Sequence, residues 1–186
     1  MKKKLVFLTG FMASGKSTIG PILANTLGWN FYDLDKVIEE KTGMLVREIF
    51  EKHGEPYFRN LEKQSLQEVL LLNNYIIALG GGTIADPVNL EMIKSTGLLI
   101  YLESSPEESY KRLRFKRDRP AFLFNGEQEP TKAEFIKKIN ELLSSRQKYY
   151  VQADVKINTD NARVGQTVDK LAAIIKKEFN REINKS

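Results

Sequence analysis

Residues 5–18 read LVFLTGFMASGKST, and this stretch decides the fold. Leu5 to Thr9 form a short apolar run typical of a buried strand, and a helical pattern begins at Ser17. Between them, residues 10–17 match the phosphate-binding pattern G-x-x-x-x-G-K-[ST], which requires a strand before it and a helix after it. The stretch therefore predicts a strand, a loop and a helix that bind nucleotide phosphates.

Each kind of residue in this loop has a chemical reason to be there. Glycines such as Gly10 and Gly15 let backbone N–H groups turn toward phosphate oxygens, and the helix N-terminus adds positive potential. Lys16 is expected to reach the outer phosphates, and the Ser17 hydroxyl to ligate Mg²⁺. GTPases, transport ATPases and small-molecule kinases share such a loop, so it does not fix the reaction.

Two features narrow the reaction class. The guanine-reading pattern Asn-Lys-x-Asp is missing, since residues 158–160 read NTD. The apolar run Tyr75 to Leu79 leads into Gly80, Gly81 and Gly82 instead of a catalytic Asp or Glu. We therefore expect an acceptor other than water beside the phosphates.

Outward from this loop, strands alternate with helices. The expected strands are residues 5–9, 30–33, 75–79, 98–102 and 155–158. The expected helices are residues 17–27, 36–42, 45–52, 55–72, 90–94, a helix from 106, 131–150 and 164–179. This alternation predicts one α/β domain over residues 1–186, with a mainly parallel sheet and helices on both faces. Residues 114–130 break the pattern and are expected to form a mobile loop.

Composition limits the function further. The chain has 186 residues, of which 41% are hydrophobic, and contains no cysteine, which excludes disulfides, thiolate metal sites and a cysteine nucleophile. The net charge of +5 suits an anionic ligand, and a nucleic acid is disfavoured because Phe115 is the only aromatic residue within the basic run 111–119. No apolar stretch reaches the roughly 18 residues of a membrane span, and the apolar run at residues 5–8 is too short for a signal core.

Asp33 and Asp35 follow the second expected strand two residues apart. In an extended backbone both carboxylates would project from one side, toward the carboxyl edge of the sheet where α/β proteins bind ligands. One could hold hydrated Mg²⁺ while the other accepts a proton from an attacking hydroxyl. The alternative, in which Asp35 caps a helix and Asp33 is merely solvated, stays open at this point.

Arg59 and Glu62 lie three residues apart within GEPYFRNLE, residues 54–62, on one face of an expected helix. Such a pair is usually a surface ion pair, but a guanidinium is also the best side chain for gripping a carboxylate with two parallel bonds. The glycines at 80–82 would admit close approach by a ligand, or form only a flexible turn.

At these residues the chain closely resembles the shikimate kinases, which belong to the P-loop nucleoside-monophosphate-kinase-like proteins. The resemblance rests on GFMASGKST, DLD, TGMLVREIFEKHGEPYFRNLE, ALGGGT, the Arg-Pro pair at 119–120 and the Arg146 helix, and covers nearly the whole chain. It implies a three-layer P-loop fold with strand order 2-3-1-4-5 and a lid at about 114–130. It also implies ATP-dependent phosphorylation of shikimate to 3-phosphoshikimate in the pathway to chorismate, with Mg²⁺.

The resemblance further implies a role for each matching residue. The ATP-binding residues would be Gly10, Ala13, Ser14, Gly15, Lys16, Ser17, Thr18, Arg112 and Arg119, with Arg112 packing on adenine. Shikimate would bind within about 33–62 and at the glycines, contacting Asp35, Arg59, Gly80, Gly81, Gly82 and Arg146. Lys16, Asp35 and Arg119 would be catalytic, and Ser17 and Asp33 would lie at the metal. The chain departs from the family at Ala13, a common glycine, and at Ala121 and Phe122, where leucines are usual.

Two other functions stay open from the residues themselves. Another small-molecule kinase, such as one for gluconate, would share the loop and differ in the acceptor pocket. A nucleotide-dependent binding module would need no acceptor residues, so Asp35, Arg59 and the glycines disfavour it. The expected enzyme is cytoplasmic and monomeric, binds ATP and shikimate, and binds neither nucleic acid nor membrane. His53 and Trp29 are expected to be structural.

Overall fold

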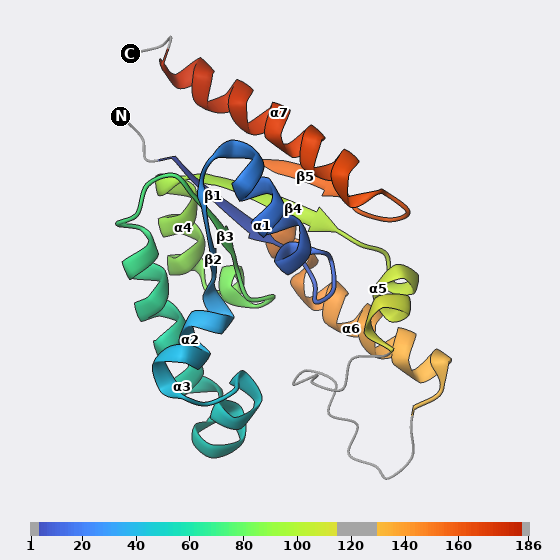
Figure 1. Cartoon of the computed structure of the whole chain (residues 1–186). Helices are drawn as coiled ribbons and strands as arrows, with labels where there is room; N and C mark the ends of the chain where they lie inside the picture. Colours follow the sequence, from blue (N-terminus) through green and yellow to red (C-terminus); the bar gives the residue numbers. More distant parts are fainter. Residues whose placement is uncertain (1–3, 115–129, 184–186) are drawn as a thin grey trace.

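The five strands form one parallel sheet in the order β2-β3-β1-β4-β5 (Figure 1), which confirms the order implied by the family resemblance. We describe residues 4–114 and 130–183 of a computed structural model. The strands are β1 (Leu5–Thr9), β2 (Asn30–Asp33), β3 (Tyr75–Ala78), β4 (Leu98–Glu103) and β5 (Val155–Asn158). All four neighbouring pairs are parallel, so the carboxyl ends of the strands share one edge of the sheet.

Helices cover both faces of this sheet because its central strand is apolar on both sides. All five residues of β1 are buried, with Leu5 and Phe7 in one core and Val6 and Leu8 in the other. The helices are α1 (Lys16–Leu27), α2 (Leu34–Thr42), α3 (Val46–Val69), α4 (Pro87–Thr96), α5 (Pro106–Leu113), α6 (Lys132–Tyr150) and α7 (Val164–Ile183), with a 3₁₀ turn η1 (Thr83–Ala85). In Figure 1, α1 and α7 lie together on one face, while α3 and α4 lie on the other.

Several helix boundaries differ from the sequence prediction, and the start of α2 matters for the site. Helix α2 begins at Leu34, two residues earlier than predicted, and the Asp33 side chain caps it by accepting from Lys36 N–H. Asp35 therefore lies in the first helical turn. The prediction that an extended backbone projects both carboxylates is wrong, and so is the alternative that Asp35 is the cap.

Helix α3 joins the two helices that were predicted over 45–52 and 55–72. At Gly54 the backbone leaves helical geometry with φ 80° and ψ 171°, so the helix is kinked there. A positive φ of this size favours glycine, and Pro56 follows as an early residue of the second half. The kink gives the two halves of α3 different directions, and both halves contribute residues to the site described below.

The strand register brings the functional loops to one level at the carboxyl edge. Ala78 of β3 is paired with Leu8 of β1 on one side and with Asp33 of β2 on the other. Leu79 N–H continues the ladder by donating to Leu8 O at 3.0 Å. The phosphate loop, the glycine turn at 80–82 and the start of α2 consequently leave the sheet side by side.

The remaining sequence predictions for the fold concern a lid and membrane-spanning segments. The mobile loop or lid predicted over 114–130 falls outside the described residues except at its two ends, and so does Arg119. Within the described ranges, no helix is both long enough and apolar enough to cross a membrane.

Candidate active site

The phosphate loop connects β1 to α1 by a tight backbone path. Gly10 has φ 146°, and a Cβ there would lie 2.4 Å from Leu102 O, so no larger residue fits. Lys16 is the first residue of α1, and its Nζ donates to Gly10 O at 2.7 Å and Phe11 O at 3.1 Å. The loop thus folds around its own lysine. Ala13 adopts the left-handed φ of 60°, a conformation that costs an alanine energy.

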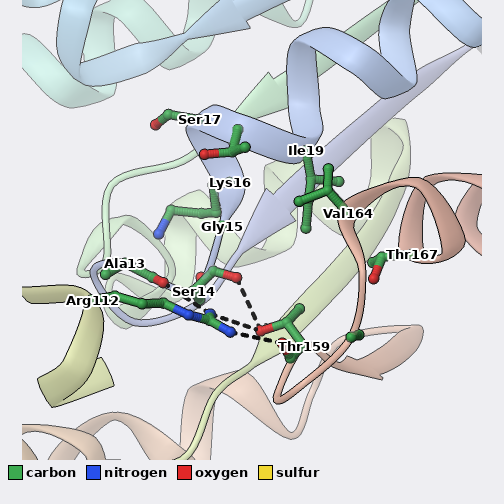
Figure 2. A pocket seen from close by; sticks show the side chains of 12 residues that line it. Ala13, Ser14, Gly15, Lys16, Ser17, Ile19, Arg112, Thr159, Val164 and Thr167 are labelled. Carbon is green, nitrogen blue, oxygen red and sulfur yellow. Dashed lines mark hydrogen bonds between the residues drawn. The ribbon is translucent and has the colours of Figure 1, made fainter. Parts of the chain in front are cut away.

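A cavity of about 400 Å³ opens beside this loop (Figure 2), and its size suits a nucleotide. It is lined by Ala13, Ser14, Gly15, Lys16, Ser17, Thr18, Ile19, Arg112, Thr159, Ala162, Val164 and Thr167. Arg112 donates to Ala13 O at 3.2 Å and to Thr159 O at 2.8 Å, so its guanidinium is held across the loop. With those edges engaged, the flat face of the guanidinium can stack on a planar ring.

Ser17 and Asp33 form the part of the site best suited to Mg²⁺. Ser17 Oγ donates to Asp33 Oδ2 at 2.9 Å, so a hydroxyl and a carboxylate oxygen already face one another. Mg²⁺ prefers oxygen ligands and usually takes one or two from the protein, with water and phosphate supplying the rest. The described residues contain no cluster of three or more acidic or histidine ligands. A Mg²⁺ site of this kind does not need one, because water and phosphate complete the coordination. The donor set therefore fits Mg²⁺.

A second cavity of about 300 Å³ also borders Lys16. It shares Ala13, Lys16 and Ser17 with the first cavity, so a phosphate held at the loop would face into both. The remaining lining residues are Met12, Asp33, Asp35, Val46, Phe50, Phe58, Arg59, Glu62, Ala78, Leu79, Gly80, Gly81, Gly82, Leu113 and Arg146. Apolar walls with a few converging charges are typical of a pocket for a small polar molecule.

Each of the three glycines of the turn admits close approach by side chains from other elements. A Cβ on Gly80 would lie 2.9 Å from Asp35 Oδ1, and one on Gly82 would lie 2.8 Å from Arg59 Nη2. A Cβ on Gly81 would lie 2.9 Å from Arg146 Nη1. Side chains from α2, α3 and α6 therefore converge on consecutive glycines because no side chain of the turn stands in their way.

Asp35 is a carboxylate poised to accept a proton. Its Oδ1 is buried and has no hydrogen-bond partner among the described residues. Burial raises the pKa of Asp35 to about 6, helped by the nearby negative charges of Asp33 and Glu62 and opposed by Lys16. A carboxylate with a pKa of about 6 is ionised at neutral pH and is a stronger base than an ordinary aspartate.

Arg59 is held from two sides by carboxylates of its own helix. Its Nε and Nη2 donate to Glu55 at 3.1 and 2.9 Å, and Nη1 donates to Glu62 at 2.9 Å. Burial opposes the charged guanidinium, but these partners outweigh it and raise the pKa of Arg59. Glu62, only 1% exposed, is fixed in turn by Thr83, whose hydroxyl donates to it at 2.6 Å. The guanidinium is thus oriented before any ligand arrives.

Comparison with known proteins decides the family. The family model described as shikimate kinase matches residues 12–176. The chain belongs to the shikimate kinase family. Members of this family are kinases that use ATP to phosphorylate a hydroxyl group of shikimate.

Individual relatives agree with this assignment. The shikimate kinase of Chlorobaculum tepidum is 42% identical over 177 residues, which span 95% of this chain and 93% of the relative. The crystal structure of shikimate kinase from Bacteroides thetaiotaomicron matches with TM-score 0.84 and 32% identity, covering 93% of this chain and 98% of that one. Shikimate kinase from Acinetobacter baumannii in complex with shikimate matches with TM-score 0.85 and 31% identity over 95% of this chain and 94% of that one.

The structure brings most of the residues suggested by the shikimate kinase resemblance into the two cavities. Asp33, Asp35, Arg59, Arg146 and the three glycines line the second cavity. The loop residues from 13 to 18 and Arg112 line the first, whereas Gly10 lines neither and binds Lys16 through its carbonyl.

Several lining residues were not anticipated from the sequence. Thr159 and Thr167 line the first cavity, and Phe50 and Phe58 line the second. Phe58 lies inside GEPYFRNLE, residues 54–62, and could have been predicted as a lining residue from that position. Thr159 carries no such signal, because its position depends on β5 ending beside the phosphate loop, where Thr159 Oγ1 lies 3.1 Å from Ser14 O.

Proposed function

We propose that this chain transfers the γ-phosphoryl group of ATP to the 3-hydroxyl of shikimate. The observation that carries the proposal is the convergence of Asp35, Arg146 and Arg59 on three consecutive glycines, next to the lysine of a phosphate loop. Two guanidinium groups suit the carboxylate of the acceptor, and a raised-pKa carboxylate suits its hydroxyl. A nucleotide-binding module without an acceptor would need none of these groups.

In the proposed reaction, Asp35 accepts the proton of the attacking hydroxyl. The hydroxyl oxygen forms a bond to the γ-phosphorus while the bond from that phosphorus to the bridging oxygen of ADP breaks. Lys16, at the junction of the two cavities, binds the phosphate oxygens and stabilises the charge that develops on them. Arg59 and Arg146 hold the acceptor carboxylate, so that the hydroxyl faces the phosphate in a fixed geometry.

Ser17 and Asp33 would hold Mg²⁺ in this proposal, because they present a hydroxyl and a carboxylate oxygen 2.9 Å apart at the cavity. When bound, Mg²⁺ neutralises negative charge on the phosphates. Arg112 would stack on the nucleotide base. We further propose, from the family resemblance, that Arg119 in the lid at 114–130 meets the transferring phosphate, that residues 33–62 form the acceptor-binding region within a single domain, and that the enzyme is a cytoplasmic monomer.

A coupled assay of ADP release tests the proposal. ATP and Mg²⁺ are held constant while shikimate, quinate, gluconate and AMP are offered in turn as acceptors. We expect release above the acceptor-free background with shikimate and at most weak release with the others. Lys16→Met is the control for contaminating kinases, since it removes the charge at the phosphates and should retain less than about a tenth of the activity. Strong release with gluconate or AMP and none with shikimate would refute the proposal.

A further inference from the structure

Tyr150 lies next to the second cavity, which is called the acceptor cavity below because it would hold shikimate in the proposed function. It is the last residue of α6 and is fully buried, with 0% of its side chain exposed. A buried phenol needs a hydrogen-bond partner, and Tyr150 finds one far away in sequence by donating to Gly81 O at 2.9 Å. Gly81 is the middle glycine of the turn on which the functional side chains converge. Tyr150 therefore joins the end of α6 to the floor of the cavity.

The ring of Tyr150 is fixed independently of its hydroxyl. It stacks on Tyr101 with ring centroids 4.8 Å apart and an angle of 13° between the planes. Tyr101 lies in β4, paired with Thr9 at the end of β1, so the stack rests on the centre of the sheet. A ring held there leaves the hydroxyl little freedom except to point at Gly81. The sheet thus sets the position of the turn through one side chain.

Arg146 is the other member of this group, one helical turn before Tyr150 on the same face of α6. A Cβ added to Gly81 would meet Arg146 Nη1 at 2.9 Å and the Tyr150 hydroxyl at 3.7 Å, so both side chains lie over the same glycine. Burial raises the pKa of Tyr150 and outweighs the opposing effect of Arg146. The phenol therefore stays protonated and keeps donating to Gly81.

Arg146 and Gly81 line the acceptor cavity, whereas Tyr150 does not. We infer that Tyr150 is a positioning residue, which fixes the Gly81 peptide and the adjacent Arg146 guanidinium in the geometry that binds the acceptor. This inference rests on the proposed function. It assigns the phenolic hydroxyl a task separate from the packing of its ring, and the two can be separated by removing a single oxygen atom.

Tyr150→Phe makes that separation, since it keeps the stack on Tyr101 and removes the bond to Gly81. The matched control is Tyr149→Phe on the neighbouring residue, whose ring lies 5.0 Å from Lys148 Nζ. The first readout is amide hydrogen exchange at residues 81–83 in the ligand-free protein. Thr83 N–H donates to Gly80 O at 3.3 Å across the Gly81–Gly82 peptide, so releasing the Gly81 carbonyl loosens that bond. We expect exchange at Thr83 to be at least about fivefold faster in Tyr150→Phe and unchanged in the control.

The second readout is steady-state kinetics with shikimate and ATP varied separately. We expect KM for shikimate to rise roughly tenfold in Tyr150→Phe, with KM for ATP and kcat within about twofold of wild type. Unchanged exchange at Thr83, unchanged KM for shikimate, or an equal rise in both KM values would each overturn the inference. The exchange readout needs no acceptor. A wild-type enzyme inactive toward shikimate would overturn the proposed function, and exchange would still decide whether Tyr150 holds the turn.

Discussion

Asp35 illustrates how a single residue is tuned by its surroundings. Its carboxylate is buried beside Asp33 and Glu62, and each of those negative charges makes ionisation of Asp35 harder. The nearby Lys16 acts in the opposite direction. The energy required to keep Asp35 charged in this setting is what makes it a better base, so activity and stability should respond to it in opposite ways.

We expect Asp35→Asn to lower turnover by roughly 100-fold and to stabilise the fold at pH 7. The pKa of about 6 exceeds the ordinary 3.8, so ionised Asp35 destabilises the folded state. This difference in pKa corresponds to a loss of folding stability of about 3 kcal/mol as an upper bound. This penalty is complete above pH 6 and disappears as the pH falls to about 4. Urea unfolding at pH 7 and pH 4 measures it.

The pH dependence of the wild-type rate should show the titration of Asp35. Below pH 6, kcat/KM for shikimate should fall about tenfold per pH unit as Asp35 becomes protonated. Asp169→Asn removes an exposed carboxylate on α7 and is the control for loss of charge. Near-normal turnover in Asp35→Asn, or a lower stability at pH 7, would show that Asp35 is not the base described above.

Arg59→Lys should weaken acceptor binding by about 2 kcal/mol or more and leave ATP binding nearly unchanged. One ammonium cannot reproduce the paired N–H donors that a guanidinium offers a carboxylate, and it would also leave Glu62 with a poorer partner. Calorimetric titration with each ligand measures the two affinities. Arg47→Lys, at the exposed ion pair with Glu51 in the same helix, is the control. Equal weakening of both ligands would remove Arg59 from the acceptor pocket.

At this scale the sequence predicted which residues lie together better than how they meet. Arg59, Asp35 and the glycines were candidates from their types and spacing, with structural alternatives left open, and their proposed roles came from the family resemblance. Which side chain faces which glycine could not be predicted, because it depends on how α2, α3 and α6 approach the end of β3. The partnership of Tyr150 with Gly81 spans 69 positions in the chain, and no local pattern reveals it.

Among the elements, the glycine turn depends most on having no side chains. Gly82 has φ −112°, which alanine adopts readily, so a substitution there tests space and not backbone strain. The atom in its way is the end of the Arg59 side chain. The fold should tolerate the change, while the guanidinium has to move.

We therefore expect Gly82→Ala to raise KM for shikimate at least tenfold while Tm changes by only a few degrees. The added methyl group would lie 2.8 Å from Arg59 Nη2 and displace it from the carboxylate. Gly165→Ala on α7 is the matched control, because a Cβ there meets no atom within 4 Å. Kinetics and thermal melting of both variants provide the measurement. An unchanged KM in Gly82→Ala would indicate that Arg59 does not need its present position.

Element boundaries also show where local sequence rules stop. The strand and helix alternation was predicted correctly because most segments, above all the central strands, are apolar where they are buried. The start of α2 was missed because Asp33 serves both as the last residue of β2 and as the helix cap. The kink in α3 was predicted as a break between helices, since Gly54 and Pro56 interrupt the pattern in either case.

For the whole molecule, the strand order explains why two cavities share one lysine. β1 lies between β3 and β4, so the phosphate loop after β1 leaves the sheet beside the glycine turn after β3. The first cavity, which would hold the nucleotide, extends from the phosphate loop toward the end of β5. The acceptor cavity extends toward α2 and α3. Donor and acceptor would therefore meet at Lys16. The net charge of +5 favours binding of two anionic substrates.

The central claim is that a phosphoryl group passes between these cavities to one hydroxyl of shikimate, and the product tests it most directly. ADP release alone would also follow from hydrolysis, so the phosphorylated product is identified by ³¹P NMR correlated to the ring protons. We predict a new phosphate monoester coupled to the proton on carbon 3 of shikimate, formed in step with ADP. Inorganic phosphate as the sole phosphorus product, or a monoester at another position, would contradict the account.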